Sequence, residues 1–521
     1  MTKIGLMEKL TKNMSDFSVI IPTAGLGSRL GKLTEFLNKS LLPYKNKPVL
    51  SHIIEQFDIN TKFIIPVGYN SQQVIDYCTL TYPERSFEFV TIDHYTESFT
   101  GPGYTIKQCL DKISSSFFYI PCDSFFDERV IHNFTEDTYF VKQVDQVLNY
   151  HYTTFKLDND RIVDYKFKEN TNSDWYAFTG VMFIKDYMSF KDRLTSLDSP
   201  EIIYTIQKNG KTVTLDSWLD FGNLDIYQDS LKQTQKFDFT KTDEVTYITN
   251  NKVIKFWKDE TIASKKYKKY LSNIDVYPEN TKYQGNFLVY DYYNGKTMYE
   301  ASDLISFTMM LDWLDKSVWK RQFIEARPDA LSFYKMKTLK RVDMFLQKYP
   351  DLPSITHVNN VPVKDYRYYL DNMHWDMLYS DVIASYTHGD LQFDNIIVSD
   401  DNKFKIIDWR HEFGNLVEIG DLYYDLSKLY GGLILDYRKI KNNEFSIVQV
   451  GDRIELTIPN VENYDFYTSQ LLQYIKYKNY NLNKVQLLIP IIFWNMAPLH
   501  SPPFDKFLWY LGIKLLDELM Q

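Results

Sequence analysis

Short apolar runs alternate with segments of helical pattern along the first 235 residues of the chain. Segments with a helical pattern occupy Ser71–Tyr77 and Gly103–Ile113. Four apolar runs have the length and composition of buried strands, namely Ser18–Pro22, Lys62–Gly68, Phe87–Asp93 and Ser116–Pro121. Strands that alternate with helices form parallel sheets with helices on their faces. The pattern therefore predicts an α/β fold with a Rossmann-like sheet for residues 1–235.

The pattern changes over residues 228–242, which are polar and rich in Gln, Lys and Thr. Such a stretch is typical of a domain boundary. Two further strands are predicted at Val245–Ile248 and Lys252–Trp257, a helix follows at Ala263–Leu271, and most of the chain after residue 295 has a helical pattern. We therefore expect a second domain, of α+β type, over residues 236–521.

Composition limits the class of protein. The chain has 521 residues, 44% of them hydrophobic and 24% charged, as in a soluble globular protein with more than one core. A formal charge of −9 with scattered Lys and Arg argues against a nucleic-acid partner. The start of the chain lacks the apolar core of a signal peptide, and the apolar segment Val485–Leu499 contains two prolines and is too short to cross a bilayer.

Three cysteines lie in one half of the chain without paired spacing: Cys78, Cys109 and Cys122. This suits a reducing compartment and neither a disulfide framework nor a zinc site. We expect a cytoplasmic protein that does not insert into membranes and acts on small molecules. The sequence is compatible with a homo-oligomer.

A glycine-rich turn, Thr23–Leu30, follows the first predicted strand. Gly25 and Gly27 would let backbone amides approach a triphosphate, because no Cβ obstructs them. Arg29 and Lys39 flank the turn and place two cations against phosphate oxygens. Alone, such a turn is as often a tight connection as a phosphate site.

The continuation of this run adds Thr34 and the segment Asn38–Pro43, with the sequence N-K-S-L-L-P. The whole run resembles the signature of the sugar-nucleotide pyrophosphorylases. That resemblance implies that the two glycines bind a nucleotide and that Arg29 and Lys39 act in catalysis. Asn38 stands where this family usually has proline, and we expect the change to spare the role of Lys39.

Two aspartates are candidate Mg²⁺ ligands in the first half. Asp123 follows the strand Ser116–Pro121, at the end of a strand where α/β sheets bind ligands. The segment Ser217–Asn223 resembles W-x-D-x-G-T of sugar nucleotidyltransferases, with Asn223 in place of threonine. In that family the two corresponding aspartates hold Mg²⁺, which maps onto Asp123 and Asp220. Either residue alone would more often be a turn or cap residue.

The same resemblance assigns four further residues. It places Gly101 at the nucleobase, and Tyr176 and Gly180 at the acceptor, with Lys168 holding the acceptor phosphate. Three of them have a plain alternative: Gly101 in an ordinary turn, Tyr176 in the core and Lys168 as a solvated charge.

The strongest motif of the second half is Ser385–Val398 followed by Lys405–Arg410. Asp390 and Asn395 stand five positions apart before one apolar strand, and Asp408 ends the next. This spacing is the D-x-x-x-x-N plus D arrangement of phosphoryl transfer, where one aspartate accepts the hydroxyl proton and the other two residues hold Mg²⁺. The alternative is a loop whose polar residues cap turns.

The segments HGDLQFDNII and IIDW resemble the aminoglycoside phosphotransferase and choline kinase family over roughly the last 280 residues. The resemblance implies a bilobal protein-kinase-like fold that binds ATP and Mg²⁺. In this family pattern Asp390 is the catalytic base, Asn395 and Asp408 are metal ligands, and His388 braces the loop. Lys255, on a strand, would pair with ATP phosphates, or else is an exposed strand lysine.

Together the two halves predict a bifunctional enzyme. The kinase half would phosphorylate a small hydroxyl compound with ATP. The other half would transfer a nucleotidyl group from a second NTP (CTP, UTP, dTTP or GTP) to that phosphate, giving an NDP-activated sugar or alcohol for surface glycan synthesis. Two alternatives remain: a choline or ethanolamine kinase joined to a CTP-dependent cytidylyltransferase, and a catalytically inactive regulatory or binding protein.

Overall fold

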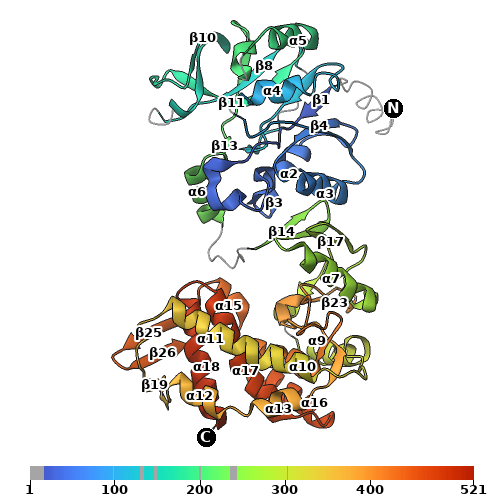
Figure 1. Cartoon of the computed structure of the whole chain (residues 1–521), viewed down its shortest axis with the longest axis vertical. Helices are drawn as coiled ribbons and strands as arrows, with labels where there is room; N and C mark the ends of the chain where they lie inside the picture. Colours follow the sequence, from blue (N-terminus) through green and yellow to red (C-terminus); the bar gives the residue numbers. More distant parts are fainter. Residues whose placement is uncertain are drawn as a thin grey trace, which may run out of the picture. The chain divides into compact units, whose positions relative to one another are not determined.

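A computed structural model describes residues 17–97, 99–129, 134–145, 150–198, 201–234, 243–301 and 303–520 (Figure 1). The chain divides into two compact units. The first comprises Met1–Thr234 with Thr246–Ile254, and the second comprises Gln235–Val245 with Lys255–Gln521. The boundary predicted between residues 235 and 236 lies outside the described residues.

A nine-stranded mixed sheet forms the first unit, in the order β5-β4-β1-β6-β11-β8-β12-β10-β9. Its first four strands run parallel, as predicted: β1 (Ser18–Ile20), β4 (Lys62–Val67), β5 (Ser86–Thr91) and β6 (Phe117–Tyr119). Across the sheet these four strands lie in the order β5-β4-β1-β6. Numbered by their order in the chain this is 3-2-1-4, which is the arrangement of a Rossmann-like half-sheet. The remaining strands are β8 (Thr138–Lys142), β9 (Thr153–Asp158), β10 (Arg161–Phe167), β11 (Trp175–Ile184) and β12 (Lys211–Thr214).

The helices of this unit differ in length from the sequence prediction. The helices are α2 (Val49–Ile54), α3 (Ser71–Thr81), α4 (Pro102–Lys107), α5 (Tyr187–Thr195) and α6 (Leu224–Thr234). The third of these ends well before the predicted Ile113, because the backbone continues in turns with i to i+3 hydrogen bonds such as Cys109 N to Ile106 O. Cys109 and Ile113 are buried in these turns, within the core that lies on this face of the sheet.

A short ladder outside the main sheet joins two distant segments of the first unit. Strand β7 (Ser124–Phe125) pairs antiparallel with β13 (Leu219–Asp220), so that Asp220 lies opposite Ser124. The backbone N–H of Phe221 also donates to the carbonyl of Asp123. This ladder brings the carboxylate of Asp220 beside the end of β6.

The hairpin strands β14 (Glu244–Thr249) and β15 (Lys252–Trp257) begin a four-stranded sheet with β17 (Phe287–Asp291) and β16 (Lys282–Gln284). Residues 246–254 of this hairpin cluster with the first unit. Tyr247 there donates to the carbonyl of Leu41 and lies 5.5 Å from the Tyr77 ring. Helix α7 (Glu260–Ser272) follows, longer at its start than the predicted Ala263–Leu271.

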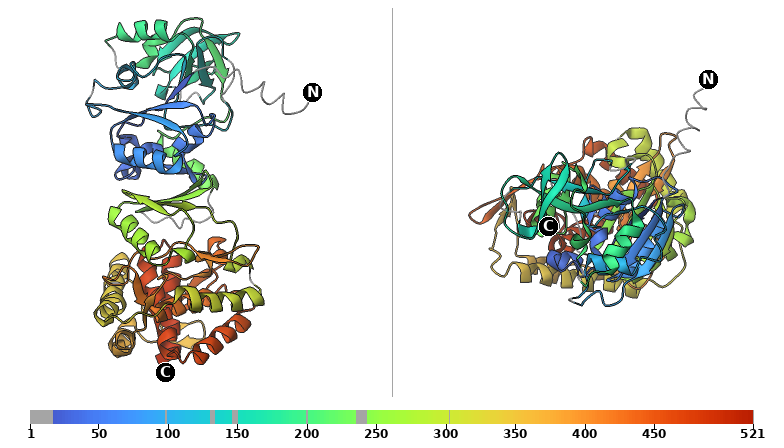
Figure 2. Two further views of the ribbon diagram at one scale, coloured as in Figure 1. Left: turned by 90° about the vertical axis from the view of Figure 1, so that its right-hand side faces the viewer. Right: turned by 90° about the horizontal axis from the view of Figure 1, so that it is seen from above.

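The rest of the second unit is mainly helical, as expected. Its longer helices include α9 (Leu304–Trp313), α11 (Lys337–Lys348), α14 (Leu422–Ile434), α16 (Tyr464–Tyr477), α17 (Leu482–Met496) and α18 (Phe504–Met520). Helix α17 packs on both α14 and α18. These late helices are drawn in orange to red in Figures 1 and 2. No helix among the described residues is long and apolar enough to cross a membrane.

Short strands flank the predicted D-x-x-x-x-N plus D motif of the second unit. Strand β21 (Ala384–Tyr386) pairs with β24 (Ile419–Asp421), and β22 (Ile396–Val398) lies between β18 (Lys296–Thr297) and β23 (Phe404–Ile406). The loop from β21 to β22 contains Asp390, and Asp408 follows β23. Antiparallel pairing of β22 with β23 therefore brings the two motif segments together.

Candidate active sites

Three predicted residues of the first unit gather around Gly222. A Cβ at this position would lie 2.8 Å from Asp123 Oδ2, 2.9 Å from Asp220 Oδ1 and 3.2 Å from Arg29 Nη2. The Gly222 N–H donates to Asp220 Oδ1 at 2.9 Å. A Cβ here would have to displace the ends of these side chains, so Gly222 allows the two carboxylates and the guanidinium to approach closely.

Lys39 completes this cluster, because its Nζ lies 2.9 Å from Asp123 Oδ2. Burial disfavours the charged form of both residues, but the attraction between Lys39 and Asp123 outweighs that effect. The pKa of Lys39 is therefore raised, and the pKa of Asp123 is lowered by Lys39 and, more weakly, by Arg29. Asp220 behaves differently: burial and the neighbouring Asp123 charge raise its pKa.

The two carboxylates fit a divalent cation. Asp123 is held ionised while Asp220 resists ionisation beside it, and a bound Mg²⁺ would remove that repulsion. No group of three or more His, Cys, Asp or Glu among the described residues could hold a metal ion. A cation at Asp123 and Asp220 would thus keep positions for nucleotide phosphates and water, as Mg²⁺ does at phosphate-transfer sites.

The glycine turn packs against the stem of Lys39. Gly27 has φ +68°, and a Cβ there would meet Thr34 Cγ2 at 3.0 Å and Lys39 Cβ at 3.2 Å. Gly25 faces the Lys39 Cε at 3.9 Å. Thr34 donates its hydroxyl to the Gly27 carbonyl at 3.0 Å. The turn therefore lies within the Lys39–Asp123 cluster, as the motif predicts.

Asn38, which departs from the family pattern, is fully buried and joins three segments. Its side-chain amide donates to the carbonyls of Thr23 and Tyr69 at 2.9 and 2.7 Å. Its Oδ1 accepts from the backbone N–H and the hydroxyl of Ser40, and its own N–H donates to Gln73 Oε1. The side chain thus positions the residue directly before Lys39. Local sequence could not show this, because the partners lie up to 35 positions away.

The remaining predicted residues of the first unit are Gly101, assigned to the nucleobase, and Lys168, Tyr176 and Gly180, assigned to the acceptor. Gly101 precedes α4, and Tyr176 lies half-buried on β11. Lys168 is exposed, with its ammonium over the Phe167 ring, as in the solvated-charge alternative. Gly180, with φ +82°, allows β11 to pass Pro121, since a Cβ would lie 2.7 Å from Pro121 Cγ. No hydrogen bond or ion pair within the described ranges links these four residues to Asp123 or Asp220.

Sequence reasoning missed two residues of the first site. Tyr152 hydrogen-bonds through its side chain to Asp220, and burial followed by that carboxylate raises the tyrosine pKa. Gly222 stands within the Ser217–Asn223 motif, which by itself assigns it no role. Asn223, the other departure from the family pattern, accepts from the backbone N–H groups of Asp225 and Ile226 and so caps α6.

In the second unit, the loop after β21 is held by Asp425 of α14. This buried carboxylate accepts from the backbone N–H groups of His388 and Gly389 at 2.8 and 2.7 Å, and from Trp319 Nε1 at 3.1 Å. Gly389 has φ +81°, and a Cβ there would lie 2.7 Å from Arg410 Cβ. The loop geometry is therefore fixed from three separate segments.

His388 braces the same loop as a neutral imidazole. Its Nε2 donates to the carbonyl of Ile407 at 2.7 Å, and its Nδ1 accepts from the N–H of Asp390 at 3.1 Å. These two bonds define one tautomer. Burial lowers the pKa of His388 to about 4. The ring thus links the Asp390 loop to the end of β23 without adding charge.

Asp390 itself forms an ion pair with Lys428 of α14, whose Nζ lies 2.7 Å from Asp390 Oδ1. The side-chain Nδ2 of Asn395 donates to the backbone carbonyl of Asp390 at 2.8 Å, and the backbone carbonyl of Asn395 accepts from the N–H of Ile407. The amide oxygen of Asn395 is therefore directed away from the loop carbonyl. Lys428 was not identified from the sequence.

Asp408 meets Lys255 in a direct ion pair of Lys255 Nζ with Asp408 Oδ1. Lys255 also lies 3.4 Å from Glu244 Oε1. Burial opposes the charge on Asp408, but Lys255 and Lys266 outweigh it, so the pKa of Asp408 is lowered and the carboxyl stays ionised. Lys255 is only 5% exposed, which excludes the exposed strand lysine given as its alternative. Asp408 and Asn395 fit Mg²⁺, because they supply a carboxylate and an amide oxygen.

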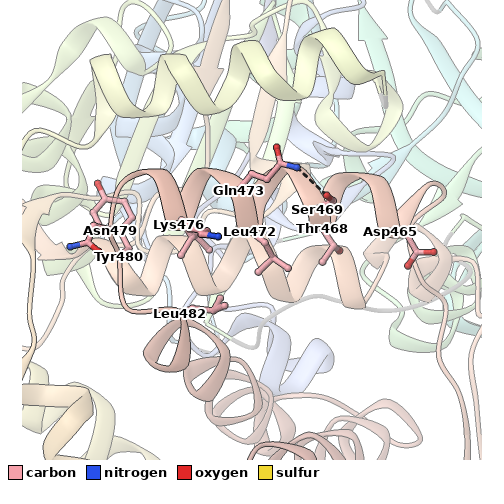
Figure 3. A pocket seen from close by; sticks show the side chains of 10 residues that line it. Asp465, Thr468, Ser469, Leu472, Gln473, Lys476, Asn479, Tyr480 and Leu482 are labelled. Atoms are coloured by element: carbon pink, nitrogen blue, oxygen red, sulfur yellow. Dashed lines mark hydrogen bonds between the residues drawn. The ribbon is translucent and has the colours of Figure 1, made fainter.

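One surface groove of the second unit lies apart from these residues. It follows one side of α16, with a volume of about 550 Å³ and a lining that includes Thr468, Leu472 and Tyr480 (Figure 3). None of its lining residues belongs to either carboxylate cluster. We place the candidate sites by the convergence of carboxylates and cations rather than by this groove.

Comparison with known protein sequences finds curated proteins that match part of this chain. The chain is 26% identical over 162 residues to "Bifunctional protein GlmU" of Methanococcus vannielii, which covers 31% of this chain and 37% of that protein. The chain thus spans about a third of the length of this curated relative. No protein-family model matches the chain.

Solved structures resemble about 42% of the chain. One is UDP-glucose pyrophosphorylase complexed with UDP-glucose, at 15% identity and a TM-score of 0.35, covering 98% of that chain. Another is CTP:phosphocholine cytidylyltransferase from Streptococcus pneumoniae, at 17% identity and a TM-score of 0.35, covering 100% of that chain. The sequence match therefore shows that part of this chain is similar to part of that GlmU protein.

Proposed function

We propose that the chain is a bifunctional enzyme that phosphorylates a small alcohol with ATP and then joins the phosphate to a nucleotidyl group. The observation that carries this proposal is the presence of two separate clusters, each of which pairs carboxylates with lysine. One contains Asp123, Asp220 and Lys39, and the other contains Asp390 and Asp408. An inactive binding protein has no need for two such charged clusters, which cost free energy to bury.

In the second unit, Asp390 would accept the proton of the attacking hydroxyl. The alcohol oxygen forms a bond to the γ-phosphorus of ATP while the bond from that phosphorus to the ADP oxygen breaks, which yields ADP and a phosphate monoester. Asn395 and Asp408 would hold Mg²⁺, which neutralises phosphate charge when bound. Lys255 would contact the ATP phosphates from its place beside Asp408.

In the first unit, the monoester oxygen would attack the α-phosphorus of a second NTP and release pyrophosphate. Arg29 and Lys39 would offset the charge that builds up on phosphate oxygens. Asp123 and Asp220 would hold Mg²⁺ there. The Gly25–Gly27 turn would bring backbone N–H groups close to the triphosphate. The product is an NDP-activated sugar or alcohol, a type of donor that suits surface glycan synthesis.

The test uses the full chain, a panel of alcohols, ATP and each of the four NTPs, with products read by mass spectrometry. The wild type should form NDP-linked product and pyrophosphate. Asp390→Asn should lower monoester formation by roughly 10²–10⁴-fold, the usual contribution of a positioned base. Supplying ready-made monoester should restore the NDP product in this variant.

The reciprocal variant is Asp123→Asn, which should accumulate monoester without releasing pyrophosphate. The exposed Asp93→Asn and Asp400→Asn are matched controls, and each should behave as the wild type. Near-normal monoester formation by Asp390→Asn would remove that residue from catalysis. Absence of both ATP consumption and pyrophosphate release across the panel would favour the inactive binding protein.

A further inference from the structure

Three cations lie beside the Asp390 loop without a carboxylate partner. Lys337 and Arg341 stand one turn apart on α11, which is drawn in yellow in Figure 1. Arg410 follows the Asp408 segment. Among the described residues, none of the three has a carboxylate oxygen within 4.0 Å. We call Lys337, Arg341 and Arg410 the α11 cation cluster.

Contacts with the same aromatic ring join two members of this cluster. The Nζ of Lys337 lies 3.8 Å from the centroid of the Phe333 ring, and the Cζ of Arg410 lies 4.9 Å from it. Arg410 also packs on Gly389, the residue before Asp390, and its backbone N–H donates to the His388 carbonyl. The cluster is thus attached to the loop that carries the proposed base.

The other polar contacts of these side chains are weak or neutral. Arg341 donates to the Met344 sulfur at 3.7 Å, and Arg410 donates through Nε to the carbonyl of Glu412. Burial lowers the pKa of Lys337 well below its ordinary value, and Arg410 and Arg341 lower it further. The nearby Asp390 does not balance the cluster, because Lys428 already pairs with it. All three side chains are partly exposed, and Arg410 and Arg341 lie close enough to Lys337 to disfavour its charged form. An anion bound among these like charges would offset their mutual repulsion.

We propose that the α11 cation cluster binds an anionic group of the alcohol that Asp390 deprotonates. This inference rests on the proposed kinase function and names its substrate class: a hydroxy compound that also carries a carboxylate or a phosphate. An anionic sugar or hydroxy acid fits this site. Choline and ethanolamine do not fit, because their positive charge would be repelled by Lys337 and Arg341. Arg is suited to the bidentate binding that carboxylate and phosphate allow.

ATP is the main rival occupant, since its phosphates are anionic as well. The structure favours the alcohol because Lys255 already lies at Asp408, on the proposed metal side of the motif. The cluster is instead built on α11 and packs against Gly389, next to Asp390. The two occupants differ in which Michaelis constant the cluster controls.

The experiment measures phosphorylation by the full chain on matched alcohols: glycerol, D-glycerate and glycerol 3-phosphate, then glucose and glucuronate, with choline and ethanolamine added. We expect kcat/KM to be at least about tenfold higher for the anionic member of a pair, since tenfold corresponds to about 1.4 kcal/mol. The carboxylate and phosphate arms identify which anion the site prefers. Lys337→Met and Arg341→Met should raise KM for that alcohol about 10-fold to 100-fold. They should leave KM for ATP within about twofold, and the exposed Lys340→Met on the same helix is the control.

A neutral or cationic alcohol as the best substrate would overturn the inference while leaving the kinase function intact. A rise in KM for ATP alone in Lys337→Met would assign the cluster to the nucleotide and also overturn it. Calorimetric titration of D-glycerate, glucuronate and glycerol 3-phosphate, with a non-hydrolysable ATP analogue present, provides a second measurement. If no alcohol is phosphorylated, binding that Lys337→Met abolishes would support the anion site and remove the kinase function. Equal binding by the wild type and Lys337→Met would overturn the anion site.

Discussion

Replacing Asn38 with alanine should destabilise the first unit and displace Lys39, the cation that pairs with Asp123. The side chain of Asn38 is fully buried and makes four hydrogen bonds, two to backbone carbonyls and two from Ser40. Alanine keeps the backbone N–H that donates to Gln73 and removes all four side-chain bonds. The perturbation therefore isolates the side-chain network.

The expected magnitude follows from these contacts. Each buried hydrogen bond contributes about 1 kcal/mol net, and a donor left without a partner in the interior costs about 1–3 kcal/mol. Four lost bonds, with the Ser40 N–H left buried, predict a decrease of about 3–5 kcal/mol in the free energy of unfolding of the first unit. Domains are stable by only about 5–15 kcal/mol, so this loss is easily measured. Nucleotidyl transfer should fall as well, because the residue after Asn38 is Lys39.

The cysteines provide an assay specific to the first unit. Cys78, Cys109 and Cys122 are all the cysteines of the chain, and all are buried in that unit. The rate of thiol labelling against urea concentration therefore reports its opening without interference from the second unit. The exposed Asn60→Ala is the control and should change the free energy of unfolding by less than about 0.5 kcal/mol. A change below about 1 kcal/mol for Asn38→Ala would refute the reasoning.

Three other perturbations test the two sites. Gly222→Ala should reduce nucleotidyl transfer by at least about 10²-fold, because the new methyl group would meet Asp123 and Asp220, while phosphorylation by the other unit serves as the internal control. The Mg²⁺ concentration needed for half-maximal pyrophosphate release should rise as the pH is lowered, because the raised pKa of Asp220 lets protons compete with the metal; a requirement that stays constant down to the pH at which the protein unfolds would contradict this. His388 has a pKa lowered to about 4, so its NMR signals should not titrate between about pH 8 and about pH 5.5, with the His388→Asn variant used to assign them. The contribution of its neutral ring to the free energy of unfolding is complete above about pH 6.5 and decreases as the pH falls towards 4.

Local sequence pattern was sufficient for the parallel strands of the first unit and for the two short strands that follow Asn395 and precede Asp408. Runs such as Lys62–Val67 are apolar along almost their whole length, and such runs form buried strands whatever surrounds them. Motif spacing likewise identified Asp390, Asn395 and Asp408, because a loop and two adjacent short strands place them within one stretch of chain. These features depend on neighbours close in sequence.

Other features depended on partners far along the chain, and only the tertiary structure decided them. The approach of Asp220 to Asp123 requires the β7–β13 ladder, and nothing within either segment specifies that pairing. Lys337 and Lys428 lie on helices whose local pattern is the same whether a lysine faces solvent or an active site. Their charge becomes informative only once packing brings α11 and α14 to the Asp390 loop, where Lys428 pairs with Asp390 and Lys337 lies near Arg410 and Arg341.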